Sequence, residues 1–462
     1  MRPEHTPSSE TKGFFHQIFR SIFPDPLFPK SHQERKRYLL KNLFLHFRPI
    51  TVPEKTLKFS LTWGLGGMAA VLVLLQLGTG LLLKFVYVPT PLGAYQSILE
   101  LNNAVMFGQL IRNIHHWCAN FLVLVVLLHM LRVFFTGAFH PPRQFNWMIG
   151  LGLFGLVLTA NFTGYLLPYD QLAYWAVTVS TGMLEYIPFI GGRLQEIIQG
   201  GNEIGPATLN IFFALHTSVV PVGLVILMAF HFWRTRKAGG LVIPRTPGEE
   251  IEEKPVRVTT LPHLLLRELV VALVLIAFVM LVSVFFDVPL GDSANPGLSP
   301  NPTKAPWYFA GPQELLLHLH PLFAVFVIPL ILVIALMVIP YLRYDTNTQG
   351  IWFASIKGRR MGLIAGLITI LAAPIGILTD EYFMDLATGL NGIPSFIGNG
   401  LIPFAFIFCA CAGFYIFIKH RYSATNNEAV QALFVLILSV FLILTITGIW
   451  FRGPGMALTW PF

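Results

Sequence analysis

Charged side chains are scarce in this chain. Only 12% of its 462 residues are Asp, Glu, Lys or Arg, whereas globular proteins average about 25%. A hydrophobic content of 54% and a mean hydropathy of +0.65 exclude a soluble enzyme and a disordered chain. Cysteine is also scarce: the chain has three, with no C-x-x-C-H motif, which excludes a disulfide framework and covalent attachment of c-type haem. We therefore expect an all-α, polytopic membrane protein.

Acidic residues are fewer than basic ones, 23 against 31, which leaves a net charge of +8. Membrane proteins concentrate Lys and Arg in their cytoplasmic segments, so this excess indicates topology and not nucleic-acid binding. With a cytoplasmic N-terminus, 26 of the 31 basic residues lie on the cytoplasmic side. Nine spans would then leave the C-terminus outside.

Long hydrophobic runs predict nine membrane-spanning helices, because a helix needs about 20 mainly apolar residues to cross a bilayer. The expected spans are 60–87, 110–136, 145–167, 207–233, 264–286, 313–342, 361–380, 400–418 and 429–450. The glycine-, proline- and charge-rich stretch 237–262 is typical of a linker. The expected units are a cytoplasmic segment over 1–58 with an amphipathic helix at 13–23, a four-helix core over 59–236, the linker, a second half over 263–380, and two more spans within 381–462.

Two of the first four spans carry paired histidines. His115 and His129 are 14 residues apart, so both rings project from nearly one helix face, about 21 Å apart along the axis. His216 and His231 are 15 residues apart, and the extra residue would turn the second ring by about 100° on an ideal helix. A kink or bulge at Pro221 could absorb this offset. Four such histidines could clamp two haem groups as axial ligands, His115 with His216 and His129 with His231.

Glycines repeat the same interval on the alternate spans. Gly66 and Gly80 are 14 residues apart on the first span, as are Gly150 and Gly164 on the third. Glycine allows the close approach that a haem face needs. Arg112, one turn before His115, could neutralise a haem propionate or simply reach the membrane interface.

These residues resemble cytochrome b of the quinol-oxidising cytochrome bc complexes, over roughly residues 50–380. The likeness includes Arg112-x-x-His115, both histidine pairs, the four glycines, GYLLPYDQ at 164–171 and AYWAVTVSTG at 173–182. The 15-residue interval resembles the chloroplast branch, whereas the fusion of two halves resembles the mitochondrial one. This mixture indicates a bacterial relative, placed in the cytoplasmic membrane.

The resemblance implies two non-covalent b-type haems and two quinone sites on opposite sides of the membrane, with menaquinone a possible substrate. At the outer site a quinol would give one electron to a Rieske iron–sulfur protein and one to the outer haem. The second electron would cross to the inner haem and reduce quinone there. A Rieske protein, a c-type cytochrome subunit and a homodimeric complex are the implied partners.

The outer quinol motif departs from the family pattern. Where the family has Pro-Glu-Trp-Tyr, this chain has Ala-Pro-Trp307-Tyr308, so Pro306 replaces the acidic residue thought to accept a proton. We expect Trp307 and Tyr308 to line the quinol pocket, and Glu314 to accept the proton. Two histidines, 318 and 320, remain alternative proton carriers, and a helix-start role for Glu314 is also open.

Two basic residues, Arg236 and Lys237, follow the last histidine and match a basic pair of the chloroplast branch. They could hold inner-haem propionates or a quinone oxygen, although a cytoplasmic helix end is expected to be basic in any case. Two other functions remain open. One is a di-haem anchor that passes electrons between the quinone pool and a partner without bifurcation, and the other is a histidine-bearing transporter without haem.

Overall fold

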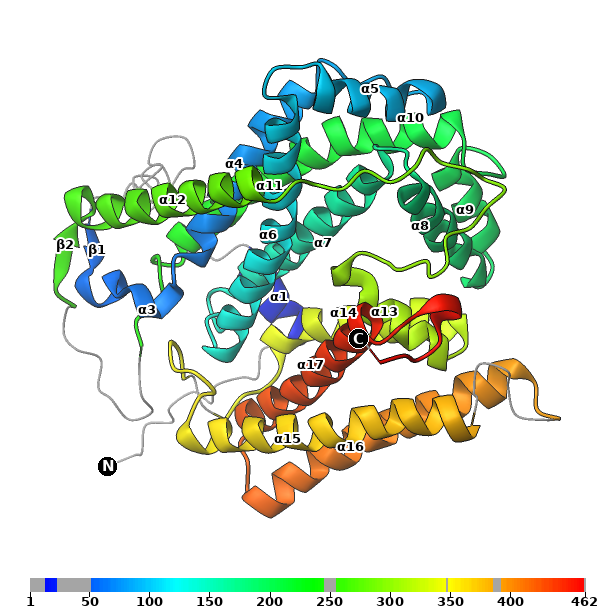
Figure 1. Ribbon diagram of the computed structural model, residues 1–462. Helices are drawn as coiled ribbons and strands as arrows, with labels where there is room; N and C mark the ends of the chain where they lie inside the picture. Colours follow the sequence, from blue (N-terminus) through cyan, green and yellow to red (C-terminus); the bar gives the residue numbers. More distant parts are fainter. Residues whose placement is uncertain (1–12, 23–50, 245–254, 346–347, 385–391, 461–462) are drawn as a thin grey trace, which may run out of the picture.

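The computed structural model describes residues 13–22, 51–244, 255–345, 348–384 and 392–460 (Figure 1). Within these residues, nine helices are long and apolar enough to cross a membrane, which confirms the all-α, polytopic prediction. These spans are Leu65–Lys84, Gly108–Phe135, Gln144–Leu166, Pro206–Lys237, His263–Phe285, Leu322–Tyr341, Ile356–Met384, Phe396–Tyr422 and Asn426–Trp450. Most of the expected segment 1–58 and the middle of the linker lie outside the described residues.

The secondary structure is almost entirely helical. The α-helices are α1 (Phe14–Ile22), α3 (Phe59–Thr62), α4 (Leu65–Lys84), α5 (Pro91–Asn103), α6 (Gly108–Phe135), α7 (Gln144–Leu166), α8 (Gln171–Gly182), α9 (Gly191–Gln199), α10 (Pro206–Ala214), α11 (Val220–Lys237), α12 (Thr260–Phe285), α13 (Trp307–His318), α14 (Ile328–Val338), α15 (Ile356–Thr379), α16 (Ile402–Tyr422) and α17 (Asn426–Trp450). The 3-10 turns are η1 (Glu54–Leu57), η2 (Met183–Tyr186), η5 (Ile339–Tyr341) and η8 (Pro454–Met456). The π-helical segments are η3 (Leu215–Val219), η4 (Leu322–Val327), η6 (Asp380–Met384) and η7 (Phe396–Leu401).

One small sheet departs from the all-helical expectation. Strand β1 (Thr51–Pro53) pairs antiparallel with β2 (Arg257–Thr259), with Val52 opposite Val258. The pairing joins the start of the first span to the end of the linker. The amphipathic helix expected at 13–23 is present as α1, where Ser21 Oγ lies 3.0 Å from the Tyr341 hydroxyl.

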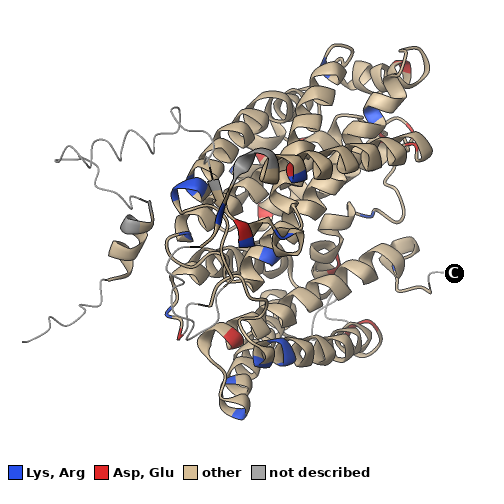
Figure 2. Ribbon diagram, turned by 90° about the vertical axis from the view of Figure 1, so that its left-hand side faces the viewer, with Lys and Arg blue, Asp and Glu red and all other residues tan. Residues whose placement is uncertain are grey.

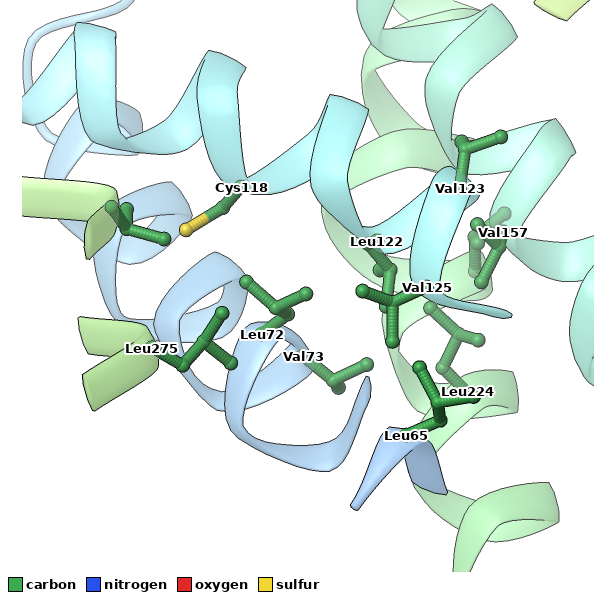
Figure 3. Close-up of a cluster of buried hydrophobic side chains, with 12 residues drawn as sticks. Leu65, Leu72, Val73, Cys118, Leu122, Val123, Val125, Val157, Leu224 and Leu275 are labelled. Carbon is green, nitrogen blue, oxygen red and sulfur yellow. The ribbon is translucent and has the colours of Figure 1, made fainter. Parts of the chain in front are cut away.

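Four spans form the N-terminal bundle: α4, α6, α7 and the continuous α10–η3–α11. Its buried core is aliphatic (Figure 3), and Cys118 is fully buried within it. Leu275 and Val279 of α12 belong to the same cluster, so α12 packs against α4 and α6 from outside. Many of the remaining apolar side chains of these helices are exposed, as expected for surfaces that face lipid.

The C-terminal half is built on α17, which also packs against the end of α6, where the ring centroids of Phe434 and Phe134 are 4.2 Å apart. Helices α13, α15 and α16 all pack against α17 (Figure 1). α17 begins with a capping box, in which Thr425 Oγ1 accepts from the Glu428 amide and the Glu428 carboxylate accepts from the Thr425 amide. Figure 2 shows Lys and Arg mainly at helix ends and in connections, with the long helices largely free of charge.

The structure corrects the boundaries of the first and sixth spans. The first begins at Leu65 and not near 60, because Trp63 and Gly64 adopt left-handed conformations, with φ of 48° and 66°, that interrupt the helix. The sixth was expected over 313–342, but α13 ends at His318 and Leu319 is extended. The span itself begins at Leu322, immediately after Pro321. Glu314 therefore lies on a separate helix that precedes the span.

Three of the π segments end two residues before a proline. η3 precedes Pro221, η4 precedes Pro329 and η7 precedes Pro403. Proline has no amide hydrogen and cannot complete the α-helical ladder. The wider π turn places one additional residue in the helix at the same point.

Candidate functional site

The four histidines lie in two pairs between α6 and the continuous η3–α11 helix. The ring centroids of His115 and His216 are 6.0 Å apart, and those of His129 and His231 are 6.4 Å apart. The rings of each pair are inclined by 74° and 75° respectively. Both pairs are thus present with nearly the same geometry, although the sequence intervals differ by one residue.

The π segment η3 is the reason for this agreement. His216 lies within it, and the amide of Val220 closes the π turn by donating to the Leu215 carbonyl. A π turn takes up one more residue than an α turn, so the 15-residue interval from His216 to His231 keeps the rotational phase of the 14-residue interval on α6. The sequence predicted a kink or bulge at Pro221; the bulge lies just before that proline.

Each of the four glycines lies against one histidine ring. A Cβ atom on Gly66 would be 3.3 Å from Cε1 of His129, and one on Gly80 would be 3.2 Å from Cε1 of His115. On α7, a Cβ on Gly150 would be 3.7 Å from Cε1 of His231, whereas one on Gly164 would be 2.5 Å from Cε1 of His216. Real Cβ contacts essentially never fall below 3.0 Å, so the Gly164 position is the tightest.

Two threonines next to these glycines were not singled out in the sequence. Thr79 Oγ1 donates to the Leu75 carbonyl at 2.7 Å and lies 2.9 Å from Nδ1 of His115, so Nδ1 is the donor in the second contact. His216 Nδ1 donates to the Ala160 carbonyl at 2.9 Å, with Thr163 Oγ1 at 3.5 Å. Nε2 of both rings is therefore left with a lone pair. A repeated Thr-Gly dipeptide, at 79–80 and 163–164, was the signal available in the sequence.

These pairs fit two axial imidazoles on one iron. An iron–nitrogen bond of about 2 Å, with the nitrogen about 1 Å from the ring centre, gives ring centroids about 6 Å apart. The Nδ1–H bonds at His115 and His216 also fix the tautomer whose Nε2 can bind metal. The residues present therefore suit two haem groups, one at each pair.

Arginines lie one turn outside the histidines on α6. Arg112 donates to the carbonyls of Val288 and Pro289, both at 2.8 Å, and thereby ties α6 to the segment after α12. Arg132 lies one turn after His129, is buried, and donates through Nε to the Leu61 carbonyl at 2.9 Å. Along α6 the pattern is therefore symmetrical, with Arg-x-x-His at one end and His-x-x-Arg at the other. The sequence analysis did not single out Arg132, because basic residues are expected at a cytoplasmic helix end.

The predicted basic pair lies at the C-terminal end of α11. Lys237 is half-buried, and its Nζ is 5.2 Å from the centroid of the Trp233 ring. Arg236 precedes it on the same turn. Arg143 donates to the Ala238 and Gly240 carbonyls and so fixes the chain just beyond this end.

The structure brings the motif at 164–171 close to the start of α13. Residues 169–171 pair with 292–295, where Gln171 N donates to the Asp292 carbonyl and Ala294 N donates to the Tyr169 carbonyl. At the start of α13, Trp307 Nε1 donates to Asn120 Oδ1 of α6 at 2.8 Å. Burial raises the pKa of Tyr308, and the nearby Tyr165 adds to this effect.

Glu314 belongs to a buried ionic cluster that the sequence did not reveal. Its side chain is fully buried, and Arg452, which follows α17, donates to it through Nε and Nη2 at 2.9 and 2.7 Å. Arg452 also donates to Glu381 at 2.8 Å. His318 Nε2 is 3.3 Å from Glu314, and its Nδ1 is 2.5 Å from Asp380. We refer to these five residues as the ionic cluster.

Hydrogen bonding within the ionic cluster outweighs the effect of burial on protonation. Burial alone would raise the pKa of Glu314, but its hydrogen bonds with His318 and Arg452 lower that pKa below its usual value. Burial would likewise lower the pKa of His318, yet its bonds to Asp380 and Glu314 raise it to about 9. His320, the other candidate carrier, lies outside the cluster and accepts from the Leu322 amide at 3.2 Å.

Comparison with known proteins gives the family. The family model of cytochrome b/b6/petB matches residues 52–239. Cytochrome b6 of Synechococcus elongatus is 42% identical over 175 residues, which are 38% of this chain and 81% of that protein. Cytochrome b6 of Heliomicrobium gestii is 40% identical over 188 residues, 41% of this chain and 87% of that protein.

The chain belongs to the cytochrome b/b6 family. This membership confirms the resemblance inferred from the histidines and glycines, and it makes the chain a multi-pass membrane protein that carries the cytochrome b core at 52–239.

A solved structure of a hyperthermophilic respiratory Complex III extends the likeness in fold beyond this core. The matched chain covers 90% of this cytochrome b/b6 chain and 96% of its own length, with a TM-score of 0.62 at 22% identity. At that identity the likeness concerns the fold alone. The second half of the chain, beyond the family match, therefore shares its fold with that solved chain.

Proposed function

We propose that this chain is the cytochrome b subunit of a quinol:cytochrome c-type oxidoreductase. The observation that carries the proposal is the pair of histidine sites between α6 and η3–α11, spaced 6.0 and 6.4 Å between ring centroids and stacked along one bundle. The structural relative comes from a respiratory Complex III, which favours the same kind of assembly here. A Rieske iron–sulfur protein and a c-type cytochrome are the proposed partners, in a homodimeric complex.

The histidines would hold two non-covalent b-type haems. His115 and His216 provide the site on one side of the membrane, and His129 and His231 the site on the other. When bound, each haem supplies one-electron transfer along the bundle axis. The glycines allow the helices to lie close to the histidine rings. Arg112 donates two hydrogen bonds to the carbonyls of Val288 and Pro289, and its guanidinium has further N–H groups that could bind a haem propionate.

Quinol oxidation is proposed at the N-terminal end of α13. Trp307 and Tyr308 form this end, and both pack against the core of the four-helix bundle. Glu314 is six residues beyond Tyr308, or about 9 Å along the helix axis. Glu314 would take the proton that quinol releases, in the role that Pro306 cannot fill.

Quinone reduction is proposed on the side where Lys and Arg gather. Arg236 and Lys237 would bind a haem propionate or a quinone oxygen there. This side is the cytoplasmic one by the charge bias, which places the ionic cluster on the outside of a bacterial cytoplasmic membrane.

The test is isolation of the complex from its native membrane. We expect a reduced-minus-oxidised spectrum of b-type haem, a Rieske signal in electron paramagnetic resonance, and reduction of haem b when an oxidant is added with quinol present. Haem b without the last two properties would indicate the non-bifurcating anchor. A preparation without any haem spectrum would contradict both functions and favour a transporter.

The role of Glu314 is tested separately by Glu314→Gln in the assembled complex. General acid–base groups typically contribute about 10²- to 10⁴-fold, so quinol oxidation should fall by at least about tenfold with haem content retained. Glu185→Gln, at an exposed carboxylate of η2, is the matched control. An unchanged rate in Glu314→Gln would exclude it as the proton acceptor.

A further inference from the structure

We propose that His318 is the proton carrier between the buried Glu314 and the surface, with Asp380 as the group that receives the proton next. The proposal rests on the proposed quinol oxidation at α13. It concerns the fate of the proton after it leaves the quinol; the sequence had offered His318 and His320 only as alternatives to Glu314 for carrying that proton.

The first argument is the placement of the His318 ring. Nε2 is 3.3 Å from Glu314 Oε1, and Nδ1 is 2.5 Å from Asp380 Oδ2, so each ring nitrogen meets a different carboxylate. An imidazole can take up a proton at one nitrogen and release another from the other nitrogen. A histidine with only one such partner could not pass a proton onward in this way.

The second argument is a gradient of exposure. The side chain of Glu314 is fully buried, those of His318 and Asp380 are 12% and 11% exposed, and that of Glu381 is 24% exposed. The first step, from Glu314 to His318, therefore leads away from the fully buried position, and Asp380 is about as exposed as His318. The neighbouring Glu381 adds a carboxylate at the more exposed edge.

The third argument is the charge around the ring. Two carboxylates and one guanidinium contact His318: Glu314 on its own helix, Asp380 on η6, and Arg452 after α17, whose Nη2 is 3.4 Å from Nε2. Glu381, also on η6, is a third carboxylate of the cluster and pairs with Arg452. Arg452 holds Glu314 ionised, so a proton that reaches Glu314 does not remain there. The excess of carboxylates stabilises the imidazolium that forms next.

The proton step is balanced within the cluster. Glu314 receives one proton from the quinol hydroxyl and passes it to Nε2 of neutral His318, which becomes an imidazolium. The Nδ1 proton then moves to Asp380 Oδ2 and from there to water. His318 is then neutral with its proton on Nε2; Nδ1 gains one proton from water and Nε2 loses one to water, which restores the starting Nδ1–H tautomer, and no electron is transferred in any of these steps.

The experiment compares His318→Gln with His320→Gln in the purified complex, with quinol oxidation measured between about pH 6 and 10. In the wild type, the rate should rise as pH approaches the His318 pKa of about 9, because the ring must be neutral to accept a proton. His318→Gln should lower the rate by at least about tenfold and remove this rise, and added imidazole should restore part of the rate. His320→Gln should leave both the rate and the profile unchanged.

Asp380→Asn tests the same route if His318→Gln does not assemble. Asparagine can still accept the Nδ1 hydrogen bond but cannot take the proton, so haem content should be retained while the rate falls. Wild-type rates and pH profiles in both variants, in a complex that oxidises quinol, would overturn the carrier role and leave the proposed function standing. A wild-type complex that does not oxidise quinol would overturn both.

Discussion

Gly164 on α7 lies directly against the imidazole of His216 in η3, and a Cβ atom at Gly164 would be 2.5 Å from Cε1 of that ring. Each of the other three glycines also lies against a histidine ring, but at a greater distance, up to 3.7 Å between a Cβ atom on Gly150 and Cε1 of His231. The position of this proposed haem ligand thus depends directly on the absence of a side chain at Gly164.

Gly164→Ala should displace the His216 ring and weaken haem binding at the His115–His216 site. Forcing a methyl group into a packed interior typically costs about 1–3 kcal/mol. Here the methyl group would displace the ring of His216, a proposed haem ligand. The haem-to-protein ratio and the reduced spectrum of the purified chain measure the loss. Gly155→Ala on the same helix is the control, because nothing lies within 4 Å of its Cβ position. Equal haem content in both variants would contradict the close contact.

Substitution of one histidine should remove one haem and leave the other. His231→Ala and His129→Ala should each lose the same spectral component, whereas His216→Ala should lose the other one, because the ligands are paired across α6 and η3–α11. A redox titration of the remaining haem identifies which component is lost. Loss of different components in His129→Ala and His231→Ala would refute this pairing.

Thr79→Val should raise the midpoint potential of the haem bound by His115. The hydrogen bond from Nδ1 to Thr79 Oγ1 makes the imidazole a stronger donor, which favours ferric iron, and valine removes this bond at nearly constant volume. Thr163→Val is the matched comparison, because His216 keeps its 2.9 Å bond to the Ala160 carbonyl. Potentiometric titration should show a larger shift in Thr79→Val; equal shifts would contradict the assignment of donors.

Arg452→Gln should destabilise the C-terminal half strongly. Removing one partner of a buried ion pair typically costs about 3–5 kcal/mol, because the other charge is left uncompensated. Arg452 and Glu314 are 1% and 0% exposed at their side chains. Thermal unfolding in detergent should therefore show a lower Tm for Arg452→Gln than for the double variant with Glu314→Gln. A double variant as unstable as the sum of the two singles would show that the residues do not interact.

The ionic cluster should also make stability depend on pH. Because the pKa of His318 is raised from 6.5 to about 9 in the folded protein, its contribution is complete below pH 6.5 and is lost as pH rises through 9. Glu314 has a lowered pKa, so its contribution is present above its usual value of 4.5 and is lost as pH falls toward the lowered value. Tm should decline between pH 6.5 and 9 in the wild type and should decline less in His318→Gln.

The sequence predicted the spans and the histidine pairs because both follow from periodicity. Apolar runs and a four-turn histidine interval are local properties that remain readable without a structure. The partners of Glu314 were not predictable in this way: Arg452 is 138 residues away and resembled an ordinary basic residue near a helix end. The end of α13 before the extended residue Leu319 was not predicted either. Leu319 is apolar and lies within a hydrophobic run, so nothing in the sequence indicated that the helix is interrupted there.

The π segment at His216 also concerns how chains of this family can differ in length without losing their ligands. The π turn beside Pro221 contains one residue more than an α turn, and this residue does not change the direction in which the later side chains project. Deletion of a single residue within η3 would convert the wide turn to an ordinary α turn and leave both rings facing α6. A helix of this kind can carry ligands at intervals of either 14 or 15 residues and still present them to the same partners, so the interval can change by one residue during evolution while the cofactor geometry is preserved.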